Sequence, residues 1–215
     1  PFSTAWAWGA VLLQAFLHPL PYPGRKGVTM KKLRFNSPVV LTFFFISLAA
    51  LILGTITHGT TTTVLFSAYR ASLTDPFTYV RFFGHVFGHA SITHFFNNML
   101  LLLVVGPPLE ELYGSKTLIS GILATAVISG LLQFILFPGS MLLGASGIVF
   151  MLIMLSSLSG AKAGTIPITL ILVAVMYLGQ ELYSIFFIQD NVANLMHIVG
   201  GVCGIGLGFV LNRSK

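Results

Sequence analysis

A serine and a histidine interrupt two apolar segments of the chain at comparable positions. Ser146 follows the turn at Pro138-Gly139 in the run Leu143-Gly144-Ala145-Ser146-Gly147, where an apolar segment restarts, and His197 lies near the start of a later apolar segment. A serine hydroxyl becomes a nucleophile when a histidine within hydrogen-bond reach takes its proton. The pair therefore predicts nucleophilic catalysis inside a membrane, provided that the two segments pack against each other.

Two further polar side chains, His94 and Asn98, lie near the start of another apolar segment. Their spacing of four places both on one face of a helix. If all three segments run inward from the outer surface, four polar side chains converge at one depth. Polar groups in a membrane are costly without partners and often mark a functional site. For any one of them, interhelical hydrogen bonding worth about 0.6 kcal/mol is the plainer interpretation.

Glycines surround both candidate catalytic residues. Gly144 and Gly147 bracket Ser146, which allows the backbone and a substrate to approach closely. Gly200, Gly204 and Gly208 recur every four residues on the face that carries His197. Such a stripe of small residues permits close helix packing. If the neighbouring helix is the one that carries Ser146, the imidazole is brought to the hydroxyl.

The composition indicates an all-α membrane protein. Of 215 residues, 55% are hydrophobic and 7% are charged, whereas soluble proteins average about 25% charged residues. Apolar stretches long enough to cross a hydrocarbon core of about 30 Å recur, with short breaks between them. We predict one bundle of six transmembrane helices, at residues 38–57, 92–109, 116–137, 144–161, 166–188 and 193–212.

Basic residues predict the orientation of this bundle, because they are enriched at the cytoplasmic ends of membrane helices. With six crossings, the basic residues that flank the helix ends fall on one side, apart from Arg70 and Arg81 in the long first connection. Both termini are therefore expected in the cytoplasm. The formal charge of +6 is explained by this asymmetry and by anionic lipid headgroups, so nucleic acid binding has no support. The cytoplasmic set is Lys31, Lys32, Arg34, Lys116, Lys162, Arg213 and Lys215.

The first 29 residues differ from the rest. Met30-Lys31-Lys32-Leu33-Arg34 has the form of a natural start followed by a basic flank. We therefore interpret residues 1–29 as an upstream extension or a flexible N-terminal segment, and residues 30–215 as the membrane domain. The single cysteine, Cys203, excludes an internal disulfide framework and is assigned to packing.

Residues 38–212 resemble the rhomboid family of intramembrane serine proteases. The resemblance is carried by His89-x4-His94-x3-Asn98, by Gly144-Ala145-Ser146-Gly147 and by His197-x2-Gly200-x3-Gly204. It implies a six-helix rhomboid-like bundle in which Ser146 is the nucleophile and His197 is the general base, without a third acid. It also implies that His94 and Asn98 stabilise the oxyanion, assisted by the backbone amide of Ser146.

The resemblance implies supporting roles as well. Phe150 resembles the aromatic residue that packs against the catalytic imidazole, and Arg81 and Glu110 resemble structural polar residues. Two departures stand out, since Val80 replaces a tryptophan before Arg81 and Met196 replaces a small residue before His197. Glu181 is interpreted as a hydrogen-bonded or snorkelled carboxylate near a helix end, and Asp190 as a helix cap. The supporting set is Gly144, Gly147, Phe150, His89, Gly200 and Gly204.

The expected function is a serine endopeptidase that cleaves single-pass or multi-pass membrane proteins near the outer face, with no metal or organic cofactor. A bacterial cell membrane is the expected location. A catalytically silent client-binding relative is the main alternative, although such proteins normally lack the serine or the histidine. A transporter would need a polar path to the inner face, and none is visible. A zinc site at His85, His89 and His94 would leave Ser146 unexplained and lacks the HExxH spacing.

Overall fold

The structure is a computed structural model that describes residues 36–159, 166–176 and 191–213. Within these ranges every element is helical, apart from one isolated antiparallel bridge between Ala68 and Leu142. Four of the described helices are long and apolar enough to cross a membrane. They are α2 (Pro38–Ile56), α5 (Ile92–Tyr113), α6 (Ser115–Leu136) and α9 (Asn191–Arg213). The predicted all-α membrane fold is confirmed at this level.

The predicted helix limits agree with the structure at most ends. Three helices lie within two residues of the predicted 38–57, 116–137 and 193–212. Helix α5 runs past the predicted end at residue 109 because Pro107 and Pro108 are accommodated inside it, and the chain turns only at Gly114, where φ is 81°. Of the predicted fifth helix, residues 168–176 are helical and residues 177–188 lie outside the described ranges. The count of six, the cytoplasmic termini and the boundary at residue 30 stay predictions.

Helix α7 corrects the fourth predicted segment. It comprises only Ser146–Leu158, 13 residues, which is about 20 Å at 1.5 Å per residue and shorter than a hydrocarbon core. The helix begins two residues after the predicted start at residue 144, because Gly144 has a φ of 125°, outside the helical region. The side chains of Met151, Leu152 and Leu155 are fully buried. Helix α7 is therefore mostly enclosed by other helices and does not need to match the bilayer thickness.

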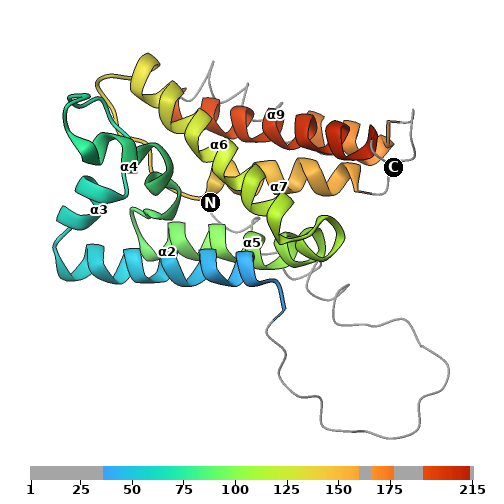
Figure 1. The fold of residues 1–215 in the computed structure, drawn as a ribbon, viewed down its shortest axis with the longest axis horizontal. Helices are drawn as coiled ribbons and strands as arrows, with labels where there is room; N and C mark the ends of the chain where they lie inside the picture. Colours follow the sequence, from blue (N-terminus) through green and yellow to red (C-terminus); the bar gives the residue numbers. More distant parts are fainter. Residues whose placement is uncertain (1–35, 160–165, 177–190, 214–215) are drawn as a thin grey trace, which may run out of the picture. The chain divides into compact units, whose positions relative to one another are not determined.

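Helices α5, α7 and α9 run in the same direction and begin at the same end of the bundle (Figure 1). Helices α7 and α9 are the most closely packed pair, since Gly200 and Gly204 lie against the backbone of Gly147 and Met151. Helix α6 runs the opposite way, with Gly121 against Leu207 of α9. The three helices that carry the candidate polar residues thus present their first turns together.

The other end of the bundle is held by a buried acid. Glu110 of α5 is 4% exposed, and its carboxylate accepts hydrogen bonds from the backbone amides of Val39 (2.9 Å) and Val40 (3.0 Å). It also accepts one from the Ser115 hydroxyl, at 2.6 Å. The residue before α2, Ser37, makes no capping bond with its side chain. Glu110 therefore caps α2 from a distant part of the chain and joins three helices, which agrees with its expected structural role.

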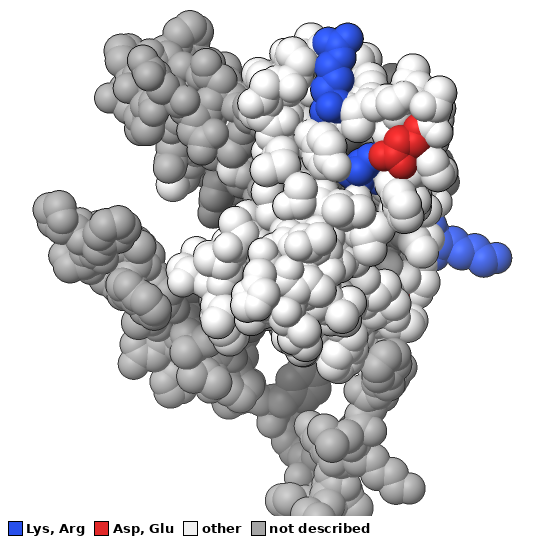
Figure 2. Space-filling view, turned by 90° about the vertical axis from the view of Figure 1, so that its left-hand side faces the viewer, with Lys and Arg blue, Asp and Glu red and all other residues white. Residues whose placement is uncertain are grey.

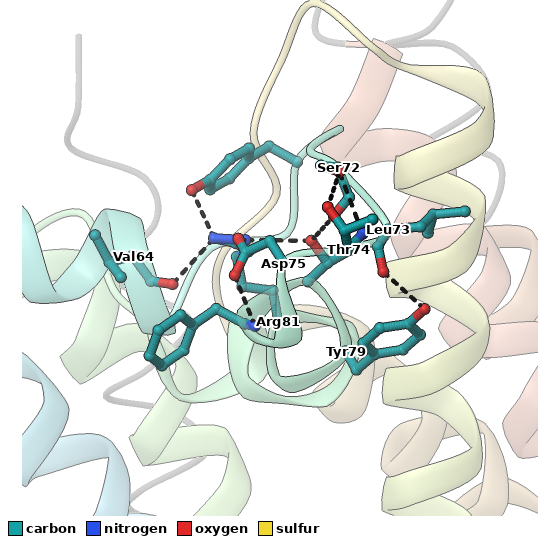
Figure 3. Close-up of polar contacts among 10 residues, drawn as sticks. Val64, Ser72, Leu73, Thr74, Asp75, Tyr79 and Arg81 are labelled. Atoms are coloured by element: carbon teal, nitrogen blue, oxygen red, sulfur yellow. Dashed lines mark hydrogen bonds and ion pairs between the residues drawn. The ribbon is translucent and has the colours of Figure 1, made fainter.

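The connection between α2 and α5 folds into short helices. These are α3 (Thr60–Leu65), α4 (Pro76–Gly84) and the 3₁₀ turn η1 (His85–Phe87). The buried guanidinium of Arg81 pairs with Asp75 (Figure 3). It also donates to the Tyr69 hydroxyl at 2.7 Å and lies over the Tyr69 ring. Seen from the side of α3 and α4, the described surface of the molecule is mostly uncharged (Figure 2). The network around Arg81 fixes α4 in place, because a buried cation needs partners.

Candidate active site

The contact between α7 and α9 is made by backbone atoms. A Cβ atom added to Gly200 would lie 2.8 Å from the carbonyl carbon of Gly147, and one added to Gly204 would lie 2.9 Å from that of Met151. Carbon atoms in contact ordinarily lie about 3.5–4.0 Å apart. Only glycine at these positions lets the two helices approach so closely. The predicted packing of the glycine stripe on the Ser146 helix is what the structure shows.

His197 packs on the face of α7 that begins with Ser146. Its imidazole is stacked on the Phe150 ring, with the centroids 4.6 Å apart and the planes within 5°. Ser146 is the first residue of α7, four residues before Phe150, so both side chains lie on the same helical face. In addition, the backbone oxygen of Met196 would lie 3.4 Å from a Cβ atom on Gly147. The structure thus brings the start of α7 to the turn of α9 that carries His197, and both Ser146 and His197 are half-buried.

His94 and Asn98 of α5 face the turn before Ser146. A Cβ atom on Gly144 would lie 2.7 Å from Cε1 and 2.8 Å from Nε2 of His94, and 3.8 Å from the Asn98 amide nitrogen. Asn98 is buried, and its amide donates to the His94 carbonyl oxygen at 3.2 Å. His94 and Asn98 therefore lie against the backbone two residues before Ser146, and His197 stacks on Phe150 one turn after it.

Two more histidines support this turn from the connection before α5. The ring of His89 meets that of His94 edge-on at 5.1 Å, and its Nδ1–H donates to the Phe87 carbonyl oxygen at 3.1 Å. His85 is 2% exposed, and its backbone oxygen accepts from the Gly144 amide at 2.9 Å. Burial lowers the pKa of each imidazole from 6.5 to about 4, so both are neutral at physiological pH.

A small cavity adjoins Ser146. Its volume is about 10 Å³, close to the minimum for one water molecule. One wall belongs to α6, where Ser129 is buried and its hydroxyl has no hydrogen-bond partner among the described residues. The sequence reasoning missed this wall, although Thr125, Ser129 and Gln133 recur every four residues on α6. The lining residues are His85, Val86, Thr125, Ser129, Leu142, Gly144, Ser146, Gly147, Ile148 and Met196.

The histidines of this region do not form a metal site in the described part of the chain. No group of three His, Cys, Asp or Glu side chains there is placed to share a metal ion. The Nδ1 atoms of His85 and His89 are each bonded to a backbone carbonyl oxygen. The described geometry therefore gives the zinc alternative no support. Glu181 and Asp190, for which the sequence predicts a carboxylate near a helix end and a helix cap, lie outside the described ranges.

Residues 76–214 match the family described as the Rhomboid domain. The chain belongs to the rhomboid family. It is 33% identical to rhomboid-related protein 1 of Caenorhabditis elegans over 141 residues. This match covers 61% of the chain and 39% of the worm protein. It is 32% identical over 139 residues to the rhomboid protease GlpG of Serratia proteamaculans, covering 63% of the chain and 49% of that protein.

A mouse protein, rhomboid-related protein 2, is 29% identical over 163 residues, which cover 65% of the chain and 53% of that protein. The match with each of these three curated relatives thus spans about half of the relative's length or less. Membership of the rhomboid family and the apolar helices together make the chain an integral membrane protein.

Proposed function

We propose that this rhomboid protein is an intramembrane serine endopeptidase in which Ser146 is the nucleophile and His197 is the general base. The observation that carries the proposal is the stacking of His197 on Phe150, because Phe150 shares a helical face with Ser146 one turn away. Relatives with a similar sequence include a protein named a rhomboid protease. The reaction class is acyl transfer at a peptide bond.

In the proposed mechanism a transmembrane substrate enters from the lipid and its outer end unwinds. The Ser146 hydroxyl attacks the exposed carbonyl carbon while His197 takes the proton and then gives it to the leaving amine, so that an ester to Ser146 forms as the C–N bond breaks. Water then cleaves the ester by the reverse proton route. Helix-weak residues near the substrate's outer end favour cleavage, because helical amides are already paired within the helix.

His94 and Asn98 are the proposed donors to the oxyanion, together with the backbone amide of Ser146. Support comes from their position against Gly144, two residues before the nucleophile. The Nδ1–H of His89 donates to a backbone oxygen, which fixes the His89 ring. The His89 ring in turn orients the His94 ring by edge-on contact. The cavity beside Ser129 has room for one water molecule next to the ester.

The finer features of the proposal concern the whole protein. They are six transmembrane helices with both termini in the cytoplasm, single-pass or multi-pass membrane proteins as substrates, and chemistry without a metal or organic cofactor. A bacterial cell membrane stays a prediction, because the similar proteins come from a worm and a mouse as well as from bacteria.

A serine-directed fluorophosphonate probe and a cleavage assay test the proposal with matched controls. Ser146→Ala is expected to abolish both labelling and cleavage, whereas Ser156→Ala, on the exposed side of α7, leaves them unchanged. Asn98→Ala is expected to slow turnover by about 10² to 10³, as the loss of one oxyanion donor does elsewhere. Its exposed neighbour Asn97 provides the matched control, Asn97→Ala. Cleavage retained by Ser146→Ala would eliminate the mechanism.

The same experiment separates the main alternative, a catalytically silent rhomboid that binds membrane clients. Folded wild-type protein that is neither labelled nor able to cleave any transmembrane substrate would favour client binding.

A further inference from the structure

A groove of about 380 Å³ runs between α2 and α6, and it shares no lining residue with the cavity beside Ser146. It extends from Pro38 to Ile46 on α2 and from Ser115 to Leu123 on α6, about 12 Å along each helix. The two helices start side by side, because Glu110 bonds both to the amides of α2 and to Ser115 of α6. The groove is lined by Pro38, Val39, Thr42, Phe43, Ile46, Phe87, Ser115, Ile119, Ile122 and Leu123.

The lining of this groove suits a hydrocarbon chain. It is apolar apart from two hydroxyls, and that of Ser115 already donates to Glu110. Phe87 packs on Phe43 with the ring centroids 4.7 Å apart and adds to the apolar wall. Water has too few polar partners in such a space, and an empty groove forfeits dispersion contacts. Both helices have the length and composition of membrane spans, so lipid is the surrounding medium.

Charge at the open end of the groove identifies the kind of lipid. Lys116 is exposed and directly follows Ser115, at the end where both helices start. The nearest acids in the sequence are Glu110 and Glu111. Of these acids, Glu110 is buried and bonded to α2. Basic side chains at a membrane surface attract anionic headgroups.

We propose that the groove between α2 and α6 binds one acyl chain of an anionic glycerophospholipid, with its headgroup beside Lys116. This site lies apart from Ser146 and does not depend on protease activity. The Glu110 cap joins α2 and α6 only at their starts. A bound acyl chain would fill the space between the two helices beyond this cap.

The test uses the full chain reconstituted in vesicles of phosphatidylglycerol and phosphatidylcholine in equal amounts. After extraction into detergent, native mass spectrometry counts the retained phospholipid. Wild type is expected to retain one phospholipid, with phosphatidylglycerol preferred about fivefold. Ile119→Trp fills the groove and is expected to lower retention about tenfold or more, since several buried methylenes are lost. Ile128→Trp is the control, because Ile128 lies on the same helix outside the groove and is 42% exposed, against 45% for Ile119.

Two further variants keep the test decisive. Thr42→Phe narrows the groove from the opposite helix and is expected to reproduce the loss seen with Ile119→Trp. Lys116→Gln is expected to keep the lipid and lose the fivefold preference. Equal retention in the groove variants and the control would overturn the proposal, and so would an unchanged headgroup preference in Lys116→Gln. A dimer that Ile119→Trp dissociates, without a change in bound lipid, would show instead that a second copy occupies the groove.

Discussion

Replacing Gly200 with alanine tests whether the distance between α7 and α9 sets the activity. The new Cβ atom would lie 2.8 Å from the carbonyl carbon of Gly147 and 3.0 Å from its Cα atom. Since carbon atoms prefer about 3.5–4.0 Å, the two backbones must separate by about 1 Å at this turn. The atoms in the way belong to backbone, so no flexible side chain can relieve the contact. The shift moves His197, three residues earlier on α9, away from the start of α7.

The expected loss follows from this displacement. A misplacement of about 1 Å in a catalytic pair costs about 10²-fold in turnover, and overpacking of this kind destabilises a fold by about 1–3 kcal/mol. Gly206→Ala is the matched control, because Gly206 lies on the same helix and a Cβ atom there meets nothing within 4 Å. Its activity is expected to stay at the wild-type level, with stability unchanged or raised by up to about 1 kcal/mol.

The assay measures initial rates of cleavage of one transmembrane substrate in detergent micelles, with thermal unfolding of each variant recorded alongside. Rates are compared well below the melting temperature of the least stable variant, so that unfolding does not contribute. Folded Gly200→Ala that cleaves at the wild-type rate would refute the reasoning. Equal losses in Gly200→Ala and Gly206→Ala would refute it too, because helix composition and not close approach would then be responsible.

Two further predictions concern stability. Glu110→Gln leaves one of the two α2 amides that Glu110 caps without its acceptor, and it is expected to lower the free energy of unfolding by about 1–3 kcal/mol. Exposed Glu111→Gln is expected to change the free energy of unfolding by less than about 0.5 kcal/mol. Thermal unfolding in detergent measures both. Lowering the pH is expected to destabilise the fold through His85 and His89. Burial lowers the pKa of each imidazole from 6.5 to about 4. Below pH 6.5 the unfolded chain therefore takes up protons that the folded chain does not, and the folded state loses stability. The loss is absent above about pH 6.5 and reaches about 3 kcal/mol for each histidine near pH 4. Melting curves recorded from pH 8 to pH 4 check this, and an acid-induced loss undiminished in His85→Gln would contradict it.

Composition was sufficient to predict the fold class, because 7% charged residues cannot cover a water-exposed surface. It was not sufficient to give the length of α7. Burial inside a bundle and contact with lipid both select apolar side chains, so an enclosed helix of 13 residues has the same composition as a membrane span. The helices between α2 and α5 were missed for a different reason. Asp75-Pro76 has the form of a helix start, and Asp75 does accept from the Phe77 amide, but the helix that follows is only nine residues long.

The candidate site residues could be selected from the sequence because their polar side chains stand out against apolar segments. Ser146, His197, His94 and Asn98 were selected by their common depth. The structure places His94 and Asn98 against Gly144 and stacks His197 on Phe150, one turn after Ser146. Ser129 was not selected. Serine and threonine in membrane helices usually bond back to a carbonyl of their own helix, so a polar stripe of this kind carries little information until its neighbours are known.

The two ends of the bundle are held by different forces, and this difference bears on function. At the end away from Ser146, the buried carboxylate of Glu110 joins three helices through charge-assisted hydrogen bonds. At the end with the candidate active site, close backbone packing of Gly200 on Gly147 and ring stacking of His197 on Phe150 set the geometry. Hydrogen bonds of the first kind tolerate small shifts, whereas packed backbone does not. Weakening the Glu110 cap should therefore reduce stability with little change in turnover, whereas Gly200→Ala should lower turnover about 10²-fold in addition to its effect on stability.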